Sequence, residues 1–156
     1  MSVEAPEAIE AVKVLAKDLN TEFPRSPRAK VGGYVIAGRM LDKCRAELAG
    51  TAGEYHFNCP LDQMFLEFAG IDAEAFKSFV ATGADDQAVG NWIKENAKQT
   101  EREPVILWNN QLLDKSMSDM PTRIQVYMED YIPENVPAGK IIYRFFDIYD
   151  YEEGRL

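Results

Sequence analysis

The sequence is poor in the residues that most often build catalytic and metal centres. Its 156 residues include one histidine, His56, and two cysteines, Cys44 and Cys59. Two cysteines are too few for a disulfide scaffold, and we expect both to be free thiols in a reducing compartment. Their spacing around His56, Cys-x11-His-x2-Cys, matches no standard zinc pattern. The sequence therefore predicts no metal and no cofactor.

Long apolar runs are also missing. No stretch of about 18 apolar residues occurs, which argues against a transmembrane helix. The first seven residues, Met-Ser-Val-Glu-Ala-Pro-Glu, have neither the basic nor the apolar region of a signal peptide. We expect a cytoplasmic protein that does not enter a membrane.

Positive charge is scarce as well. The chain has 17 Lys and Arg against 26 Asp and Glu, a net charge of −9. Such an acidic protein repels nucleic acid and anionic membranes as a whole, so we predict neither as a partner. The imbalance is uneven, because residues 25–45 hold six basic residues and one acidic residue, or +5, against −3 before and −11 after this stretch.

Complete catalytic motifs are absent. The sequence contains no Gly-x-Gly-x-x-Gly, Gly-x-Ser-x-Gly, Ser-x-x-Lys or His-Glu-x-x-His. Dinucleotide binding, hydrolase and zinc-protease activities therefore have no support. This favours a binding role over an enzymatic one.

The sequence does contain helical periodicity, because apolar residues recur at spacings of three and four and sustained alternation is missing. We predict an all-α, single-domain protein over residues 1–156, with frayed ends at 1–5 and 152–156. Only residues 51–59 are plausible as a strand. Helices are expected near 6–18, 29–49 and 60–68, between Asp72 and Gly83, from Asp85 or Asp86 onward, and near 102–116, 119–131 and 139–151.

Several motifs follow one another in an order typical of a known family. They include Pro24-Arg-Ser-Pro-Arg28, Arg39-Met-Leu-Asp-Lys43, Cys59-Pro-Leu-Asp62 and Gly70-Ile-Asp72. This order resembles a bacterial family catalogued as domain of unknown function 5069. The resemblance implies no reaction, cofactor or catalytic residue.

The basic stretch is the first candidate site. Arg39 and Lys43 lie four residues apart and so share one face of a helix. If the extended Pro-Arg-Ser-Pro-Arg segment folds back along that face, its cations would line a concavity suited to a phosphate, a carboxylate or an acidic peptide. We predict that this region binds a small anion or a protein partner through five residues: Arg25, Arg28, Lys30, Arg39 and Lys43.

The alternative for these cations is neutralisation within the chain, since exposed charges are usually solvated or paired. The carboxylates considered as their partners include Asp147, Asp150, Glu152 and Glu153.

The second candidate is the turn before residue 60, which indicates an alternative function. Cys59 would stand at a helix N-terminus, which favours a thiolate, and His56 could act as its base. A thiol-dependent enzyme or redox protein would then be centred on Cys59, with Tyr55 and Asp62 modulating it. Asp62 opposes this, because its carboxylate would occupy the same positive helix end. A structural role for Cys59 is the other alternative.

The C-terminal segment is rich in aromatic residues. Such a stripe is either core or an association surface, so a homodimer through this segment is a further possibility. Its members are Tyr143, Phe145, Phe146, Tyr149 and Tyr151.

Overall fold

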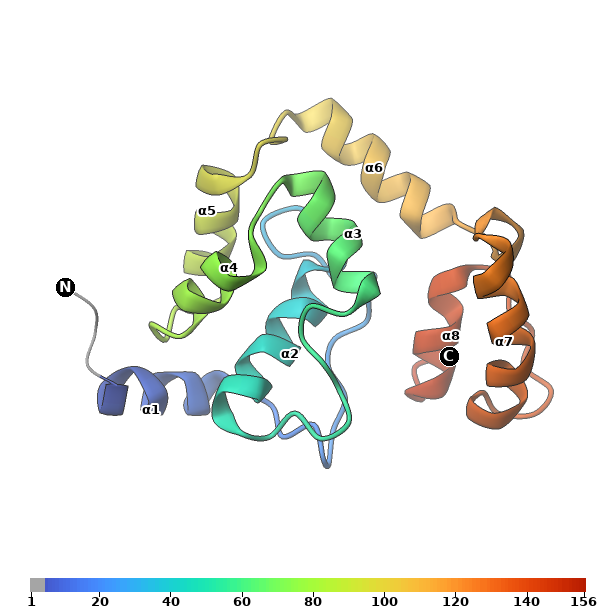
Figure 1. Cartoon of the computed structure of the whole chain (residues 1–156), viewed down its shortest axis with the longest axis horizontal. Coiled ribbons are helices and arrows are strands. Elements are labelled where there is room, and N and C mark those ends of the chain that lie inside the picture. The colour runs from blue at the N-terminus through green and yellow to red at the C-terminus, as the bar shows by residue number, and fades with distance from the viewer. Residues whose placement is uncertain (1–4) are drawn as a thin grey trace. The chain divides into compact units, whose positions relative to one another are not determined.

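The computed structural model describes residues 5–156, and over this range the fold is all-α, as predicted (Figure 1). Residues 5–156 form eight α-helices and one 3₁₀ turn, and the only β-type pairing among them is an isolated bridge between Val31 and Tyr34. Residues 1–4, expected to fray, lie outside the described residues. The helices are α1 Ala5–Leu15, α2 Ala37–Ala49, α3 Pro60–Ala69, α4 Ala73–Val80, α5 Asp86–Asn96, α6 Arg102–Asp114, α7 Thr122–Asn135 and α8 Phe145–Glu152.

The chain divides into two compact units, Met1–Val105 and Ile106–Leu156, with the boundary inside α6. The sequence predicts a single domain over residues 1–156. The single domain stays a prediction, and a single cooperative unfolding transition would support it.

Helix α2 is the centre of the first unit. It contacts α1, α3 and α4, which lie around it in Figure 1. Ten consecutive residues, from Ala37 to Ala46, are buried. Successive residues of a helix point in all directions, so α2 is covered on every side and not only along the apolar stripe that the sequence shows. Its charged residues are therefore buried together with its apolar ones.

The start of α2 corrects the predicted bounds. The sequence predicts a helix from about residue 29, whereas α2 begins at Ala37. Gly32 and Gly33 have φ angles of +65° and +91°, which a right-handed helix does not allow. Their turn closes the Val31–Tyr34 bridge. Residues 29–36 therefore form a compact turn before the helix.

The next three helices begin where the local signals place them. Asp72 accepts a hydrogen bond from the Ala75 amide at 2.9 Å, and Asp85 accepts one from the Ala88 amide at 2.8 Å. Both carboxylates satisfy amides that the first turn of a helix leaves open. Cys59 occupies the N-cap position of α3, with Pro60 following it in the first turn. Residues 51–59 form turns, not a strand.

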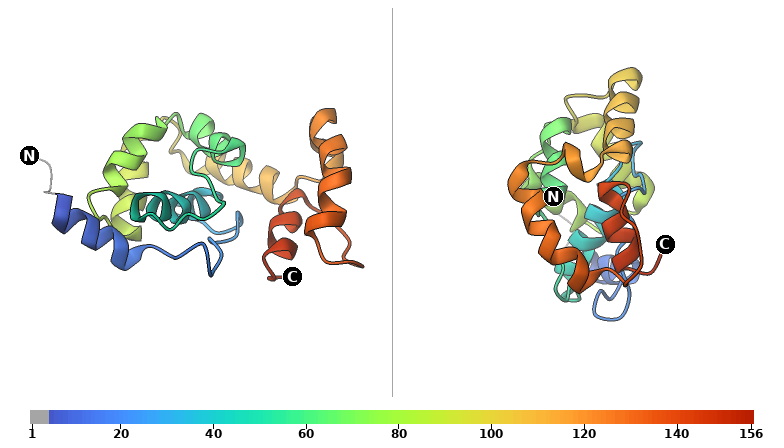
Figure 2. Two further views of the ribbon diagram at one scale, coloured as in Figure 1. Left: turned by 60° about the horizontal axis from the view of Figure 1, so that its bottom comes forward. Right: turned by 90° about the vertical axis from the view of Figure 1, so that its right-hand side faces the viewer.

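In the second unit, α7 and α8 lie side by side (Figure 2). The Tyr131 hydroxyl donates to the Glu152 carboxylate, 2.7 Å from Oε2. Helix α8 begins at residue 145 and not near 139, because Asp147 Oδ2 accepts the Tyr143 and Arg144 amides at 3.0 and 2.8 Å and so caps the helix there.

Part of the predicted aromatic stripe is core. Phe145 is 5% exposed and Phe146 is fully buried, whereas Tyr143 is 65% exposed. The homodimer through this segment stays a prediction. At the chain end, where fraying is expected, Arg155 Nη1 lies 3.1 Å from Asp150 Oδ1 and 2.7 Å from Glu153 Oε1.

Candidate functional site

The five cations predicted as one binding site have different surroundings. Arg25 and Lys43 are engaged by carboxylates of the first unit. Arg39 Nη1 donates to the Arg25 carbonyl at 3.2 Å, and its guanidinium lies 5.5 Å from the centre of the Tyr55 ring.

The other two cations of the predicted site lie just before α2. The Arg28 amide donates to the Ser26 hydroxyl at 3.1 Å. Lys30 is exposed and forms no ion pair within the described part of the chain.

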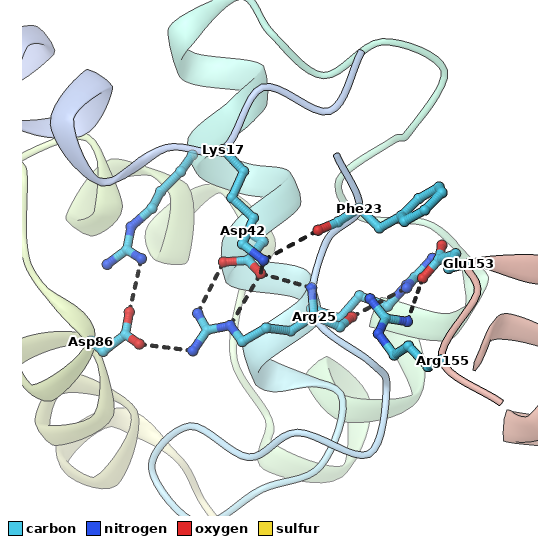
Figure 3. Close-up of polar contacts among 9 residues, drawn as sticks. Lys17, Phe23, Arg25, Asp42, Asp86, Glu153 and Arg155 are labelled. Atoms are coloured by element: carbon cyan, nitrogen blue, oxygen red, sulfur yellow. Dashed lines mark hydrogen bonds and ion pairs between the residues drawn. The ribbon is translucent and has the colours of Figure 1, made fainter. Parts of the chain in front are cut away.

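Arg25 is the centre of a charge network on one side of α2. Figure 3 shows its side chain between the carboxylates of Asp42 and Asp86. Arg25 donates to Asp42 through its backbone amide at 2.8 Å, through Nε at 3.1 Å and through Nη2 at 3.0 Å. Its Nη1 donates to Asp86 Oδ2 at 2.8 Å. Asp42 is 4% exposed, so this pair is largely shielded from water.

A second arginine shares Asp86. Arg45 Nη1 donates to Asp86 Oδ1 at 2.8 Å, and Nη2 donates to the Ala84 carbonyl at 3.0 Å. Arg45 is only 3% exposed, and its Nε has no hydrogen-bond acceptor within the described residues. A guanidinium offers five N–H donors, so Arg45 has donors left over.

The network fixes the charge of Asp86. Burial by itself raises the pKa of this carboxyl group, but hydrogen bonds and charge from Arg25 and Arg45 outweigh burial and hold the pKa below its usual value. Asp86 is therefore a carboxylate at neutral pH. It occupies the position between two guanidinium groups that a ligand anion would also favour.

Lys17 completes the group of cations. Its Nζ donates to the Phe23 carbonyl at 3.2 Å and lies 3.9 Å from Asp42 Oδ2 (Figure 3). An ammonium group has three donors. Its side chain is about one-third exposed, at 34%, so Lys17 can donate to a further partner from the solvent side.

These side chains line one pocket of the first unit, with a volume of about 500 Å³. Pockets of this size hold small ligands. Three cations and three carboxylates face it. Its lining residues are Leu15, Lys17, Arg25, Asp42, Arg45, Asp85, Asp86 and Gln87.

Of the five predicted site residues, only Arg25 lines this pocket. Sequence reasoning missed Lys17, Arg45 and Asp86. Arg45 follows Asp42 by three residues, which places the two on one helix face, and this spacing could have indicated it. No local signal in the sequence connects Arg45 or Asp42 to Asp86, which lies 41 residues beyond Arg45.

Lys43 belongs to a second cluster, on the α3 side of α2. Its Nζ lies 3.0 Å from Asp62 Oδ2 and 3.0 Å from the Cys59 sulfur. Lys43 is 3% exposed and Asp62 is fully buried, whereas Cys59 is half-buried. His56 is exposed, and no hydrogen bond joins it to Cys59 in the described chain. The side chain at hydrogen-bond distance from the thiol is thus Lys43, whereas the sequence suggested His56.

Residues 5–156 contain neither a metal-binding cluster nor a membrane-spanning helix. No group of three or more His, Cys, Asp and Glu side chains there lies close enough together to hold a metal ion. None of the described helices combines the length and the apolar character needed to cross a bilayer.

Comparison with known proteins bears on the family of this chain. No curated protein matches the sequence. The model of the family described as Domain of unknown function (DUF5069) matches residues 21–155, a range that includes Arg25, Arg45, Asp86 and the Lys43 cluster. Because this match covers nearly the whole chain, the protein belongs to the DUF5069 family.

Proposed function

We propose that this protein is a non-enzymatic binding module whose pocket at Lys17, Arg25 and Arg45 takes a small ligand through an anionic group. The group is a carboxylate or a phosphate, the anions that guanidinium donors recognise best. The proposal keeps the class of ligand predicted from the basic stretch. It places the site on the solvent-facing side of the Arg25 network and not along residues 25–43 as a whole.

The observation that carries the proposal is the state of Arg45. Its side chain is almost fully buried, lines the pocket and keeps an Nε donor without an acceptor. Nη1 and Nη2 carry two hydrogens each and make one hydrogen bond each, to Asp86 and to the Ala84 carbonyl, so the guanidinium can donate further to an anion in the pocket. Lys17, on the same pocket wall, has donors to spare.

The carboxylates that line the pocket limit how strongly an anion can bind there. Asp42 is satisfied by Arg25, and Asp85 caps α5, so neither offers its charge fully to the pocket. Asp86 is different, because its side chain is 51% exposed and repels an incoming anion. A ligand anion therefore competes with Asp86 for the two arginines, and neutralising Asp86 should strengthen binding.

The test is a titration of the full chain with inorganic phosphate and with acetate, followed by amide chemical shifts in NMR spectra. Lys17→Met should weaken binding roughly tenfold, because it removes one charge-assisted hydrogen bond of about 1.5–3 kcal/mol. Lys30→Met is the matched control, because Lys30 is an exposed lysine that does not line the pocket. It should leave the affinity unchanged.

Asp86→Asn gives the second arm of the test, since a gain in affinity does not arise from a damaged fold. Tighter binding of phosphate or acetate by this variant supports the proposal. Equal losses in Lys17→Met and Lys30→Met would overturn it, and so would a dissociation constant weaker than about 10 mM for both anions.

A further inference from the structure

The cluster of Lys43, Asp62 and Cys59 lies outside the pocket and has its own chemistry. Lys43 comes from the buried helix α2, whereas Cys59 and Asp62 belong to the start of α3. The ammonium nitrogen is 3.0 Å from the sulfur and 3.0 Å from a carboxylate oxygen. One buried cation is therefore shared between two groups that can each carry a negative charge.

The position of Cys59 at the start of a helix adds to its contact with Lys43. Cys59 stands at the N-cap of α3, a helix of ten residues, where the helix dipole is positive. Its thiol makes no capping hydrogen bond, so the sulfur is not committed to the backbone. A thiolate beside a lysine ammonium at a helix N-terminus is the environment in which protein thiols become reactive.

Asp62 is the competitor for the same cation, and its two oxygens differ in their hydrogen bonding. Its Oδ2 accepts from Lys43 and from the Asn58 amide, at 2.9 Å from the latter. Its Oδ1 is buried and receives no hydrogen bond from the described residues. Burial raises the pKa of this carboxyl group more than Lys43 lowers it. Burial thus weakens the hold of the Asp62 charge on Lys43, and the ammonium is shared with the Cys59 sulfur at the same distance.

The two cysteines differ in their exposure to solvent. Cys59 is half-buried, whereas Cys44 is fully buried and burial raises the pKa of its thiol to about 12. Only Cys59 combines a charged partner with exposure to solvent. Oxidation of protein thiols follows these two properties.

From this geometry we infer that Cys59 is a thiol that hydroperoxides oxidise reversibly to a sulfenic acid, with Lys43 as the proton donor. The thiolate sulfur attacks the terminal oxygen of the hydroperoxide, and the S–O bond forms as the O–O bond breaks. The sulfur loses two electrons to the peroxide. The leaving oxygen takes a proton from the Lys43 ammonium and departs as water or an alcohol. A low-molecular-weight thiol then condenses with the sulfenic acid to a mixed disulfide and releases water, and a second molecule of the same thiol attacks this disulfide, freeing the Cys59 thiol and leaving as the small-molecule disulfide.

The experiment treats the full chain with hydrogen peroxide at neutral pH and traps sulfenic acid with dimedone. Mass spectrometry of the peptides then gives the rate at each cysteine. Cys59 should be oxidised at least tenfold faster than glutathione under the same conditions, and Cys44 should remain unmodified. A Cys59 rate equal to that of glutathione would overturn the inference.

Variants separate the role of Lys43 from a general change in the fold. Asp62→Asn should raise the Cys59 rate several-fold, because the ammonium then has the thiolate as its only anionic partner. Replacing both charges, in Lys43→Met with Asp62→Leu, avoids an unpaired buried ion and should lower the rate at least tenfold. His56→Ala should have no effect. A rate that falls in His56→Ala, or is unchanged in both cluster variants, would contradict the inference.

Discussion

Arg25 holds Asp42 with three donors: its backbone amide, its Nε and its Nη2, all within 3.1 Å. A residue that the sequence marks as a ligand-binding cation is thereby tied to the central helix. Its position is fixed by a carboxylate that is 4% exposed. The proposed anion contacts are therefore those of Arg45 and Lys17, which have donors left over, while Arg25 supports the pocket wall.

This relationship predicts a large stability effect at Asp42. Asp42→Asn removes the charge that three Arg25 donors share, and it should lower the free energy of unfolding by about 2 kcal/mol or more. Chemical denaturation measures the change. Glu95→Ala, on the exposed side of α5, is the control and should stay within about 0.5 kcal/mol of the parent. Similar values for both variants would show that the Arg25–Asp42 contact does not stabilise the fold.

Asp86 predicts a pH dependence of stability. Its folded-state pKa lies below the usual value, because the two arginines outweigh the effect of burial. The stabilisation by ionised Asp86 is therefore fully present above its unfolded pKa of about 4 and is lost as pH falls through the lower, folded value. The stability difference between the parent and Asp86→Asn, measured by thermal unfolding from neutral to acidic pH, should shrink below about pH 4. A difference that is constant over this range contradicts the assignment.

Two glycines make a matched pair for packing. Gly83 and Gly50 have φ angles of +88° and +77°, so alanine costs about 1–2 kcal/mol at either position. A Cβ on Gly83 would lie 2.4 Å from the Ala11 Cβ in α1, whereas a Cβ on Gly50 meets nothing within 4 Å. Gly83→Ala should therefore lower the free energy of unfolding by about 1–3 kcal/mol more than Gly50→Ala. Equal losses would mean that α1 does not pack against residue 83.

In the second unit, the hydrogen bond from Tyr131 to Glu152 can be tested against a neighbouring tyrosine. Burial and the Glu152 carboxylate both raise the pKa of Tyr131. Tyr131→Phe should lower the free energy of unfolding by about 1 kcal/mol. The Tyr127 ring stacks on Tyr131, and its hydroxyl has no hydrogen bond within residues 5–156. Tyr127→Phe should consequently leave the free energy of unfolding nearly unchanged. An equal loss in both variants would show that the hydrogen bond to Glu152 does not stabilise the fold.

Local sequence signals predict most of the fold. Asp72, Asp85 and Pro60 mark the starts of three helices, because a capping carboxylate or a proline acts within one turn. The start of α2 is not predictable in this way. The left-handed φ angles at Gly32 and Gly33 stop the helical pattern before Ala37, and the Ile36 amide pairs with the distant Pro27 carbonyl. Periodicity alone therefore predicts a helix that continues through residues 29–36.

The candidate sites depend on longer-range geometry. Arg25 is recognisable in the basic stretch, but its partners Asp42 and Asp86 are 17 and 61 residues away. Lys43 and Cys59 are 16 residues apart and meet only because α2 and α3 pack together. The sequence thus indicates which groups carry charge, and tertiary packing decides which of them face a pocket and which face one another.

Binding of an anion by Arg45 and Lys17 can be seen in a crystal structure of the full chain grown or soaked with selenate. Selenium gives an anomalous signal that locates the anion. We expect a selenate in the pocket, with oxygens about 2.7–3.2 Å from the side-chain nitrogens of Arg45 and Lys17. Selenate bound at exposed lysines such as Lys30, with none beside Arg45, would contradict it.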